Sequence, residues 1–239
     1  MVLPSACGGC GRVRTALCAE CAEALCGGPV RRARPDPEPA GLPAVWGAAG
    51  YEDAVRAVLL AHKERGALGL AGVLGRALAA AVRAAAGRSA GEGTLLLVPV
   101  PSSRGAVRAR GHDAGRRIAR AASAELRRSG TPARMLGALR QRRAVADQTG
   151  LDASQRLANL SGALEVVPGG VGLLDGGRVV LVDDLMTTGA SLVEASRAVR
   201  AVAGLEFPGT GEPVAAVVAA PPLSFENKPE LIADLRRCR

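Results

Sequence analysis

The stretch VVLVDDLMTTGAS, residues 179–191, ends an apolar run with two adjacent carboxylates, Asp183 and Asp184, and follows them with a turn rich in small and hydroxyl residues. Ligands of open α/β sheets bind beyond the carboxyl ends of the strands, which is where this pair would lie. The turn would point N–H groups and hydroxyls at a phosphate, at the positive end of the next helix. The acids suit vicinal hydroxyls, so a ribose 5-phosphate matches both parts. The alternative is an ordinary helix cap preceded by surface acids.

Four cysteines near the start of the chain form a second group with chemical potential. Cys7 and Cys10, then Cys18 and Cys21, make two CxxC pairs separated by seven residues. Such pairs let four thiolates converge on one tetrahedral ion. Disulfides are disfavoured in a reducing cytosol, and a redox site would need only one pair. The spacing therefore predicts a structural Zn²⁺ that supplies the folding energy of a small module.

The positive charge is concentrated in the middle of the chain. The formal net charge is +9, and residues 104–156 hold 13 arginines against four acidic residues, which accounts for the whole excess. This segment is expected to face an anion such as a phosphate or a nucleic acid. The alternative is a compositional bias toward arginine. Aromatic residues make up only 2% of the chain, so stacking platforms for single-stranded nucleic acid are scarce.

Apolar runs and helical periodicities predict the elements that must position these groups. Strands are expected at 94–100, 179–182 and 213–220, with shorter ones at 133–136 and 164–167. Helices are expected at 51–63, 70–86, 112–128, 153–160 and 191–202, and a polar loop at 140–152. This alternation is typical of an α/β fold, in which a mostly parallel sheet carries helices on both faces.

The changes in composition along the chain predict its domains. Residues 1–29 form the cysteine module, 30–43 a Pro- and Arg-rich linker, 44–222 the main domain and 223–239 a C-terminal helix or tail. No apolar signal segment precedes the first cysteines, and Arg76 and Arg83 interrupt the apolar stretch 68–86. We therefore expect a cytoplasmic protein without membrane insertion; its oligomeric state is not predicted.

Residues 179–191 resemble the phosphoribosyl pyrophosphate signature of type I phosphoribosyltransferases, and further motifs are similar to those of the ComF family within that fold. The motifs that carry the resemblance are the four cysteines; Tyr51 and Lys63; Val98, Pro99, Val100 and Pro101 followed by Arg110 and Gly111; and Gln148, Arg156 and Asn159. The resemblance covers nearly the whole chain up to about residue 220. One departure is that His112 and Asp113 stand where the family usually has an aromatic residue and asparagine.

The resemblance implies a type I phosphoribosyltransferase-like fold that binds Mg²⁺–phosphoribosyl pyrophosphate. Asp183 and Asp184 are the implied catalytic pair and would hold the ribose 2- and 3-hydroxyls. The residues implied in binding the 5-phosphate and the pyrophosphate are Met186, Thr187, Thr188, Gly189, Ala190 and Ser191, and then Ser102, Ser103 and Arg104. Further candidates are Arg140, Arg142, Arg143, Gln148 and Thr149 in a loop able to close over the site, with Arg156 and Lys63. The alternatives are a solvated loop and, for Lys63, a residue that complements its helix dipole.

Three functions follow from the resemblance and stay open. The first is transfer of phosphoribose to an unidentified acceptor with release of pyrophosphate. The second is sensing of phosphoribosyl pyrophosphate without turnover. The third is an accessory role in DNA uptake during natural competence, in which the cysteine module and the arginine-rich face contact nucleic acid.

Overall fold

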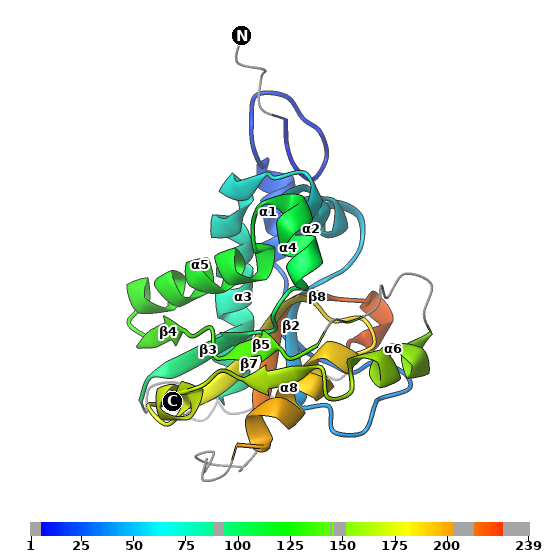
Figure 1. The fold of residues 1–239 in the computed structure, drawn as a ribbon. Coiled ribbons are helices and arrows are strands. Elements are labelled where there is room, and N and C mark those ends of the chain that lie inside the picture. The colour runs from blue at the N-terminus through cyan, green and yellow to red at the C-terminus, as the bar shows by residue number, and fades with distance from the viewer. Residues whose placement is uncertain (1–5, 88–92, 144, 146–151, 203–212, 227–239) are drawn as a thin grey trace, which may run out of the picture.

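In the computed structural model, the protein has an α/β fold with a mostly parallel sheet at its centre (Figure 1). The structure describes residues 6–87, 93–143, 145, 152–202 and 213–226. Within them, six strands follow the order β1 (Arg31–Ala33), β2 (Ala44–Gly50), β8 (Val214–Ala220), β7 (Arg178–Leu185), β3 (Leu95–Pro99) and β4 (Ala133–Met135). Only β1 runs antiparallel to its neighbour; the other pairings are parallel. A separate antiparallel hairpin consists of β5 (Leu139–Gln141) and β6 (Leu164–Val166).

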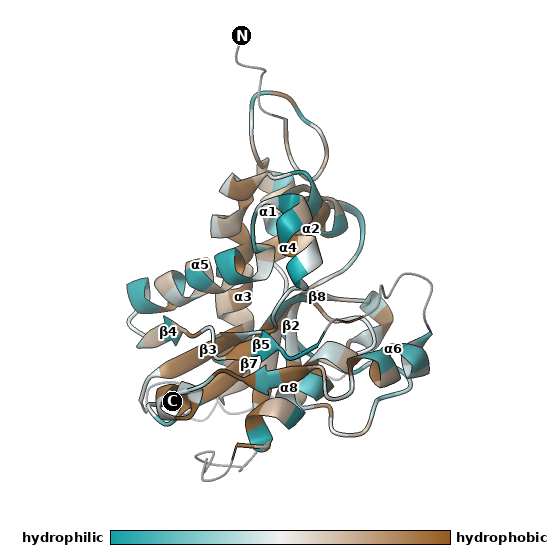
Figure 2. Cartoon of the chain, viewed as in Figure 1, coloured by the Kyte–Doolittle hydropathy of each residue, from teal (hydrophilic) through white to brown (hydrophobic). Residues whose placement is uncertain are grey.

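Helices cover both faces of this sheet. They are α1 (Ala19–Cys26), α2 (Asp53–Glu64), α3 (Ala71–Ala86), α4 (Arg104–Arg110), α5 (Ala114–Arg128), α6 (Ala153–Leu160), α7 (Gly170–Leu174) and α8 (Ala190–Arg200). Alternate residues of β7 point to opposite faces: Val180 and Val182 pack with α3 and α5, whereas Val179 and Leu181 pack with α8. Both faces of the central strands are therefore apolar, as their colours in Figure 2 show.

The register of the parallel strands sets the edge at which the acidic pair lies. Pro99 at the end of β3 is opposite Val182 of β7, and Asp183 is opposite Val217 of β8. The sequence predicted that the strand would end at Val182, but β7 continues to Leu185 because β8 pairs with it as far as Ala219. The two carboxylates therefore belong to the last part of the strand, and its pairing with β8 holds their backbone in place.

Two predicted irregular segments contribute strands. The predicted linker, 30–43, contains β1, which pairs with β2 at the edge of the sheet. The predicted polar loop, 140–152, begins within β5, because Arg140 pairs with Glu165 of β6. Both strands have only three residues, too few for a period-two pattern to be distinguished from a loop.

Residues at both ends of the described chain pack onto the main domain. Leu25 of α1 is fully buried in the core that contains α2 and α3. Phe225 is buried, bridges to Ala33, and lies where a side chain on Gly47 would collide with it. Residues 223–226 of the predicted tail thus belong to the fold, whereas 227–239 lie outside the described residues.

One helical segment of the described chain, Leu68–Ala86, has the length and apolar composition of a membrane span. In its most apolar window, 56% is buried inside the fold, where α3 packs against both α5 and the sheet. The burial of this helix within the core accounts for its apolar composition.

Candidate functional site

A cavity of about 590 Å³ opens at the carboxyl ends of β3 and β7. This volume is in the range of small-molecule sites. Its lining brings together seven of the residues singled out from the sequence: Lys63, Ser102, Ser103, Asp183, Asp184, Thr187 and Ser191. They come from α2, from the turn after β3, from β7 and from the turn into α8. The parallel strands place these ends at one edge, as the pattern of the sequence predicted.

One member of the acidic pair, Asp184, forms an ion pair with a lysine that lies far away in the sequence. Lys63 Nζ lies 2.8 Å from Asp184 Oδ2 and 3.1 Å from Oδ1. Asp184 is buried, with 8% of its side chain exposed, and its N–H donates to Asp183 Oδ1 at 2.8 Å. The charge of Asp184 is thereby neutralised within the protein, while Asp183 keeps carboxylate lone pairs for a ligand.

The surroundings of Asp183 and Lys63 shift the pKa of each group. Burial, and then repulsion by Asp184, raise the pKa of Asp183 to about 8, although Lys63 acts in the opposite direction. Burial would lower the pKa of Lys63, but the attraction of Asp184 and Asp183 outweighs it and raises that pKa. A proton or a hydroxyl donor close to Asp183 would therefore relieve a concentration of negative charge.

The turn between β7 and α8 has the tight geometry that its sequence predicted. Gly189 adopts a left-handed conformation, φ 78°, just before the first residue of α8. A Cβ atom on Gly189 would also lie 2.7 Å from Leu42 Cδ1. Thr187 and Ser191 on either side line the cavity, so their hydroxyls and the first turn of α8 lie at its wall.

The remaining residues of the predicted phosphate turn do not line the cavity. Met186 is buried in the core beneath α8, and its N–H donates to the carbonyl of Ala219. Its side chain does not belong to the cavity lining, and its role in ligand binding stays a prediction. Thr188, Gly189 and Ala190 shape the turn and are not among the residues that line the cavity.

The turn after β3 contributes hydroxyl groups but not its predicted arginine. Ser103 caps α4, and its Oγ accepts the N–H of Ala106 at 3.1 Å. Ser102 and Ser103 line the main cavity, whereas Arg104 lines a neighbouring cavity of about 210 Å³ together with Arg140 and Arg116. The cation that α4 presents to the main cavity is Arg110, which sequence reasoning did not assign to the site.

The other loop candidates lie around the site or outside the described residues. Arg140 pairs with Glu165 across the hairpin at 2.8 Å, and Arg143 donates to the carbonyls of Asn159 and Ser161, each at 2.8 Å. Arg156 lies in α6 and does not line the cavity. Gln148 and Thr149 lie outside the described residues, so their predicted role stays a prediction. Gln141 at the end of β5 lines the cavity and was not predicted.

His112 and Asp113, which depart from the family pattern, both have defined contacts. Asp113 caps α5, because its Oδ1 accepts the N–H of Arg116 at 3.0 Å. The ring nitrogens of His112 lie 3.0 Å from the carbonyl oxygen of Arg110 and 3.2 Å from that of His62. Carbonyls only accept, so a ring nitrogen that bonds to one of them is the donor. His112 thus joins the end of α2 to the end of α4.

The four cysteines of the N-terminal module converge on one point. Their sulfur atoms all lie within 4.8 Å of one another, and among the described residues this is the group of cysteine, histidine and acidic side chains arranged to hold a metal ion. Burial opposes ionisation of Cys7, but N–H groups of Cys10, Cys18 and Gly9 that donate to its sulfur lower its pKa to about 6. Four sulfurs with one favoured thiolate form a site that can hold a metal ion.

The cysteine module rests on the helix that carries Lys63. A Cβ atom on Gly9 would lie 2.6 Å from Cys21 Sγ and 3.4 Å from Val58 of α2, and one on Gly8 would lie 2.8 Å from Leu70. These glycines let the loop approach both the sulfurs and the main domain closely. Figure 1 shows α1 and α2 side by side at the same end of the molecule.

Comparisons with known proteins do not identify a family for the chain. A scan against protein-family models finds no match for the chain, and a search of curated proteins finds none either.

Proposed function

We propose that the chain is a type I phosphoribosyltransferase-like protein of the ComF kind, which binds Mg²⁺–phosphoribosyl pyrophosphate and transfers phosphoribose to an acceptor. The observation that carries the proposal is the Lys63–Asp184–Asp183 arrangement in a cavity also lined by Thr187 and Ser191. In this proposal the acids accept hydrogen bonds from the ribose hydroxyls, and the turn into α8 holds the 5-phosphate. The resemblance described from the sequence supports the same ligand.

Transfer would require the acceptor to attack C1 of the ribose as pyrophosphate leaves. The acceptor lone pair forms the new bond to C1, the C1–oxygen bond breaks, and its electrons leave with the pyrophosphate. The acceptor gives up a proton to solvent or to a nearby base. Positive charge develops on the sugar, so the carboxylate of Asp184 would stabilise it, and cations near the leaving group would stabilise the opposite charge.

Two metal ions accompany this proposal. Mg²⁺ prefers oxygen ligands and enters such sites largely on substrate phosphates. Asp183 and Asp184 are the carboxylates that line the cavity within the described part of the chain, and Asp184 is already paired with Lys63. The ion would therefore arrive with the diphosphate and neutralise its charge. For the cysteine module we propose Zn²⁺, because four thiolates in tetrahedral array are its typical structural site.

Calorimetric titration with Mg²⁺–phosphoribosyl pyrophosphate tests the ligand. The double variant Asp183→Asn, Asp184→Asn should lose binding, whereas Asp175→Asn, an exposed acid after α7, should bind like wild type. In a thermal-shift assay, ligand at about 100 times its dissociation constant should stabilise wild type by about 2.7 kcal/mol. Unchanged affinity in the double variant would overturn the proposal.

Turnover separates the transferase from a sensor that binds the same ligand. A transferase should release pyrophosphate when it receives the correct member of a panel of nucleobases and related amines. A sensor should bind without release in every case.

For zinc, elemental analysis should find about one ion per chain, and Cys18→Ser should lose it. A zinc-free chain that stays folded would contradict the metal assignment.

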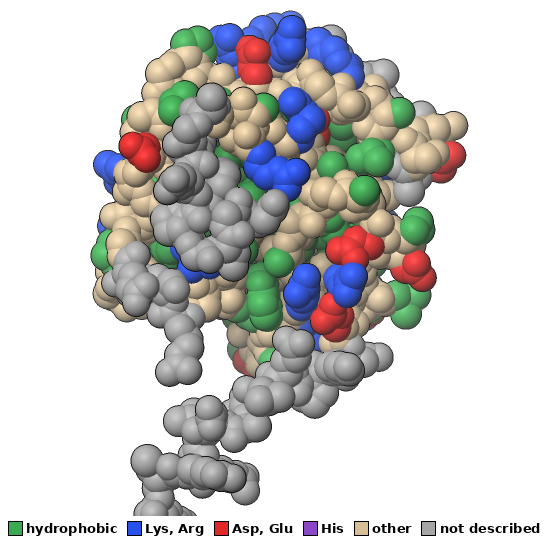
Figure 3. Space-filling model, turned by 90° about the horizontal axis from the view of Figure 1, so that it is seen from below, with side chains coloured by type: hydrophobic (Ala, Val, Ile, Leu, Met, Phe, Trp, Pro, Cys, Tyr) green, Lys and Arg blue, Asp and Glu red, His purple; other side chains and the backbone are tan. Residues whose placement is uncertain are grey.

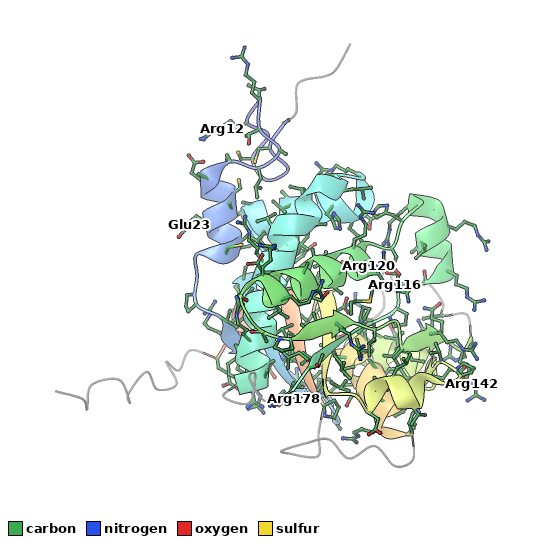
Figure 4. All side chains as sticks on the ribbon, turned by 90° about the vertical axis from the view of Figure 1, so that its left-hand side faces the viewer. Arg12, Glu23, Arg116, Arg120, Arg142 and Arg178 are labelled. Carbon is green, nitrogen blue, oxygen red and sulfur yellow. The ribbon has the colours of Figure 1, made fainter. Side chains whose placement is uncertain are left out.

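A nucleic-acid contact is the second candidate, supported by the surface of α5. Ile118, Ala122 and Leu126 are buried, which leaves the arginines on the other face exposed: Arg116, Arg117, Arg120, Arg127 and Arg128. Figure 4 labels two of them, Arg116 and Arg120, and Figure 3 shows lysine and arginine side chains gathered along the upper edge of the face it presents. DNA binding through these groups should weaken steeply with salt, and a flat salt response would exclude it.

A further inference from the structure

The carboxyl ends of α2 and α4 meet beside the cavity, at the same end of the molecule (Figure 1). α2 ends at Glu64 and α4 at Arg110, and these two side chains form an ion pair at 3.1 Å. The last carbonyls of a helix have no donor within the helix. In α2 the carbonyl of Ala61 accepts two N–H groups from residues after the helix, but no backbone N–H of the described residues donates to that of His62. Because His62 is buried, its carbonyl needs a donor from elsewhere in the fold.

The side chain of His112 supplies that donor. Its Nε2 lies 3.2 Å from the carbonyl oxygen of His62, and its Nδ1 lies 3.0 Å from that of Arg110, two residues earlier in the chain. Gly111, with φ 72°, turns the chain at the end of α4 and so brings the ring to this place. Nε2 is the nitrogen that reaches across to α2, so a proton on Nε2 joins the two helices. A phenyl ring at this position has no such donor.

The last turn of α2 also carries the lysine of the site. Lys63 directly follows His62, and its Nζ lies 2.8 Å from Asp184 Oδ2. A long lysine side chain loses conformational entropy when it is held in one place, and it loses more if its backbone must be ordered at the same time. If the last turn of α2 frays, Lys63 leaves and Asp184 stays buried without a partner, which is costly. The contact between Lys63 and Asp184 therefore depends on the end of the helix.

We infer that His112 is a positioning residue of the site, which completes the last turn of α2 through its hydrogen bond to the His62 carbonyl and so holds Lys63 on Asp184. Its effect on ligand binding rests on the proposed function, whereas its effect on Lys63 does not. Without this hydrogen bond Lys63 would move away, and the cavity would carry more unneutralised negative charge. A ligand with phosphate groups would then bind more weakly, because like charges repel.

Chemical labelling of lysine measures this contact without a ligand. The lysines of the chain are Lys63 and Lys228, so acetylation with acetic anhydride and mass spectrometry of the peptides give a rate for each. His112→Phe keeps a flat ring and removes both nitrogens. The rate at Lys63, relative to that at Lys228, should rise about 3- to 10-fold, which corresponds to the loss of one hydrogen bond. Asp184→Asn gives the rate that Lys63 reaches when its partner is removed.

Two amide variants distinguish the two ring nitrogens. The amide nitrogen of glutamine reaches about as far as Nε2, and that of asparagine about as far as Nδ1. His112→Gln should therefore keep the rate at Lys63 within about twofold of wild type, whereas His112→Asn should behave like His112→Phe. Glu64→Gln is the matched control, because it removes the partly exposed ion pair between the same helix ends. It should change the rate by less than about twofold.

Calorimetric titration of the same variants with Mg²⁺–phosphoribosyl pyrophosphate connects the contact to the ligand. His112→Phe should bind about 3- to 10-fold more weakly than wild type, and His112→Gln should recover most of the loss. An unchanged rate at Lys63 in His112→Phe, or equal rates in the glutamine and asparagine variants, would overturn the role of His112. Wild type that does not bind the ligand would overturn the proposed function, while the labelling would still decide whether His112 holds Lys63. Thermal melts confirm that each measurement reports on folded protein.

Discussion

At the scale of single residues, the raised pKa of Asp183 couples stability to pH. The folded protein holds this proton up to about pH 8, whereas the unfolded chain releases it near 3.8. The stabilising contribution is therefore fully present below the lower value and is lost as the pH rises through the upper one. Asp183→Asn has no such proton. Its free energy of unfolding should fall less than that of wild type between about pH 5 and about pH 9.

Urea denaturation at several pH values measures this difference. The free energy of unfolding of the variant should rise relative to that of wild type as the pH rises. The same variant should bind the proposed ligand more weakly, because groups with a strongly shifted pKa are common at functional sites. Asp175→Asn provides the comparison, because Asp175 is exposed at the surface. Parallel stability curves for Asp183→Asn and wild type would show that the carboxylate of Asp183 is not perturbed by its surroundings.

The sequence predicted part of this site at residue level, for reasons that particular residues illustrate. Asp183 lies in the last part of a strongly apolar strand, and Thr187 and Ser102 follow such strands, so their meeting at one sheet edge follows from topology. The pairing of Lys63 with Asp184 spans 121 positions, and no local pattern encodes it. Arg110 was not assigned to the site because α4 has no buried face that would reveal its phase, whereas Arg104, assigned by the resemblance, lines the neighbouring cavity.

At the scale of elements, an ion pair between a buried carboxylate, Glu194, and the partly exposed Arg197 holds the β5–β6 hairpin against α8. Glu194 is buried and accepts hydrogen bonds from the N–H of Leu164 at 2.8 Å and from Arg197 Nε at 2.7 Å. Arg197 in turn donates to the carbonyl of Leu164 at 2.9 Å. Gln141 of the same hairpin lines the cavity, so this clamp also positions one wall of the site.

Glu194→Gln should therefore loosen the hairpin. The free energy of unfolding should fall by about 1.5–3 kcal/mol, because hydrogen bonds to a charged group are lost. Hydrogen exchange should accelerate in β5 and β6 more than in β7. Burial opposes the ionisation of Glu194, yet Arg197 and the N–H of Leu164 lower its pKa. Wild type should thus lose this contribution as the pH falls below about 4.5 and through the lowered value.

Glu165→Gln is the control for the same hairpin. Glu165 lies on β6 and pairs with Arg140 at 2.8 Å, but both side chains are partly exposed. Loss of a surface pair should cost less than about 1 kcal/mol. Equal effects of the two variants would show that the buried carboxylate of Glu194 has no special role in holding the hairpin.

The elements themselves were predicted best where apolar patterns are long. The helix predicted at 153–160 has the bounds of α6, and α3, α5 and α8 differ from prediction by one or two residues. The chain lacks such a pattern in β2, whose small residues Gly47, Ala48 and Ala49 read equally well as a loop. In α1 the close spacing of the cysteines concealed the helix.

At the scale of the whole molecule, the core depends on the close approach of α3 and α5. A Cβ atom on Gly75 would lie 2.5 Å from Ala121 Cβ and 2.8 Å from the backbone of that helix. Gly75→Ala should therefore separate the two helices and destabilise the protein by about 1–3 kcal/mol, although alanine favours helix formation. Gly72, exposed on α3 with open space around it, gives the matched variant. Gly72→Ala should be neutral or stabilising by up to about 1 kcal/mol in thermal or chemical denaturation. Equal stability of the two variants would contradict tight packing at this crossing.

The contact of the cysteine module with α2 gives the molecule a thermodynamic linkage. Val58, near the middle of that helix, lies beside Gly9 of the metal-holding loop, and Lys63, near its end, holds Asp184. A metal ion that orders the loop also fixes the helix, and a ligand that binds at the acids fixes the same helix from its other end. Each occupant should then raise the affinity of the other by the same factor. On the proposed function, a shortage of zinc would therefore lower the affinity of the protein for a sugar phosphate before it unfolds the protein.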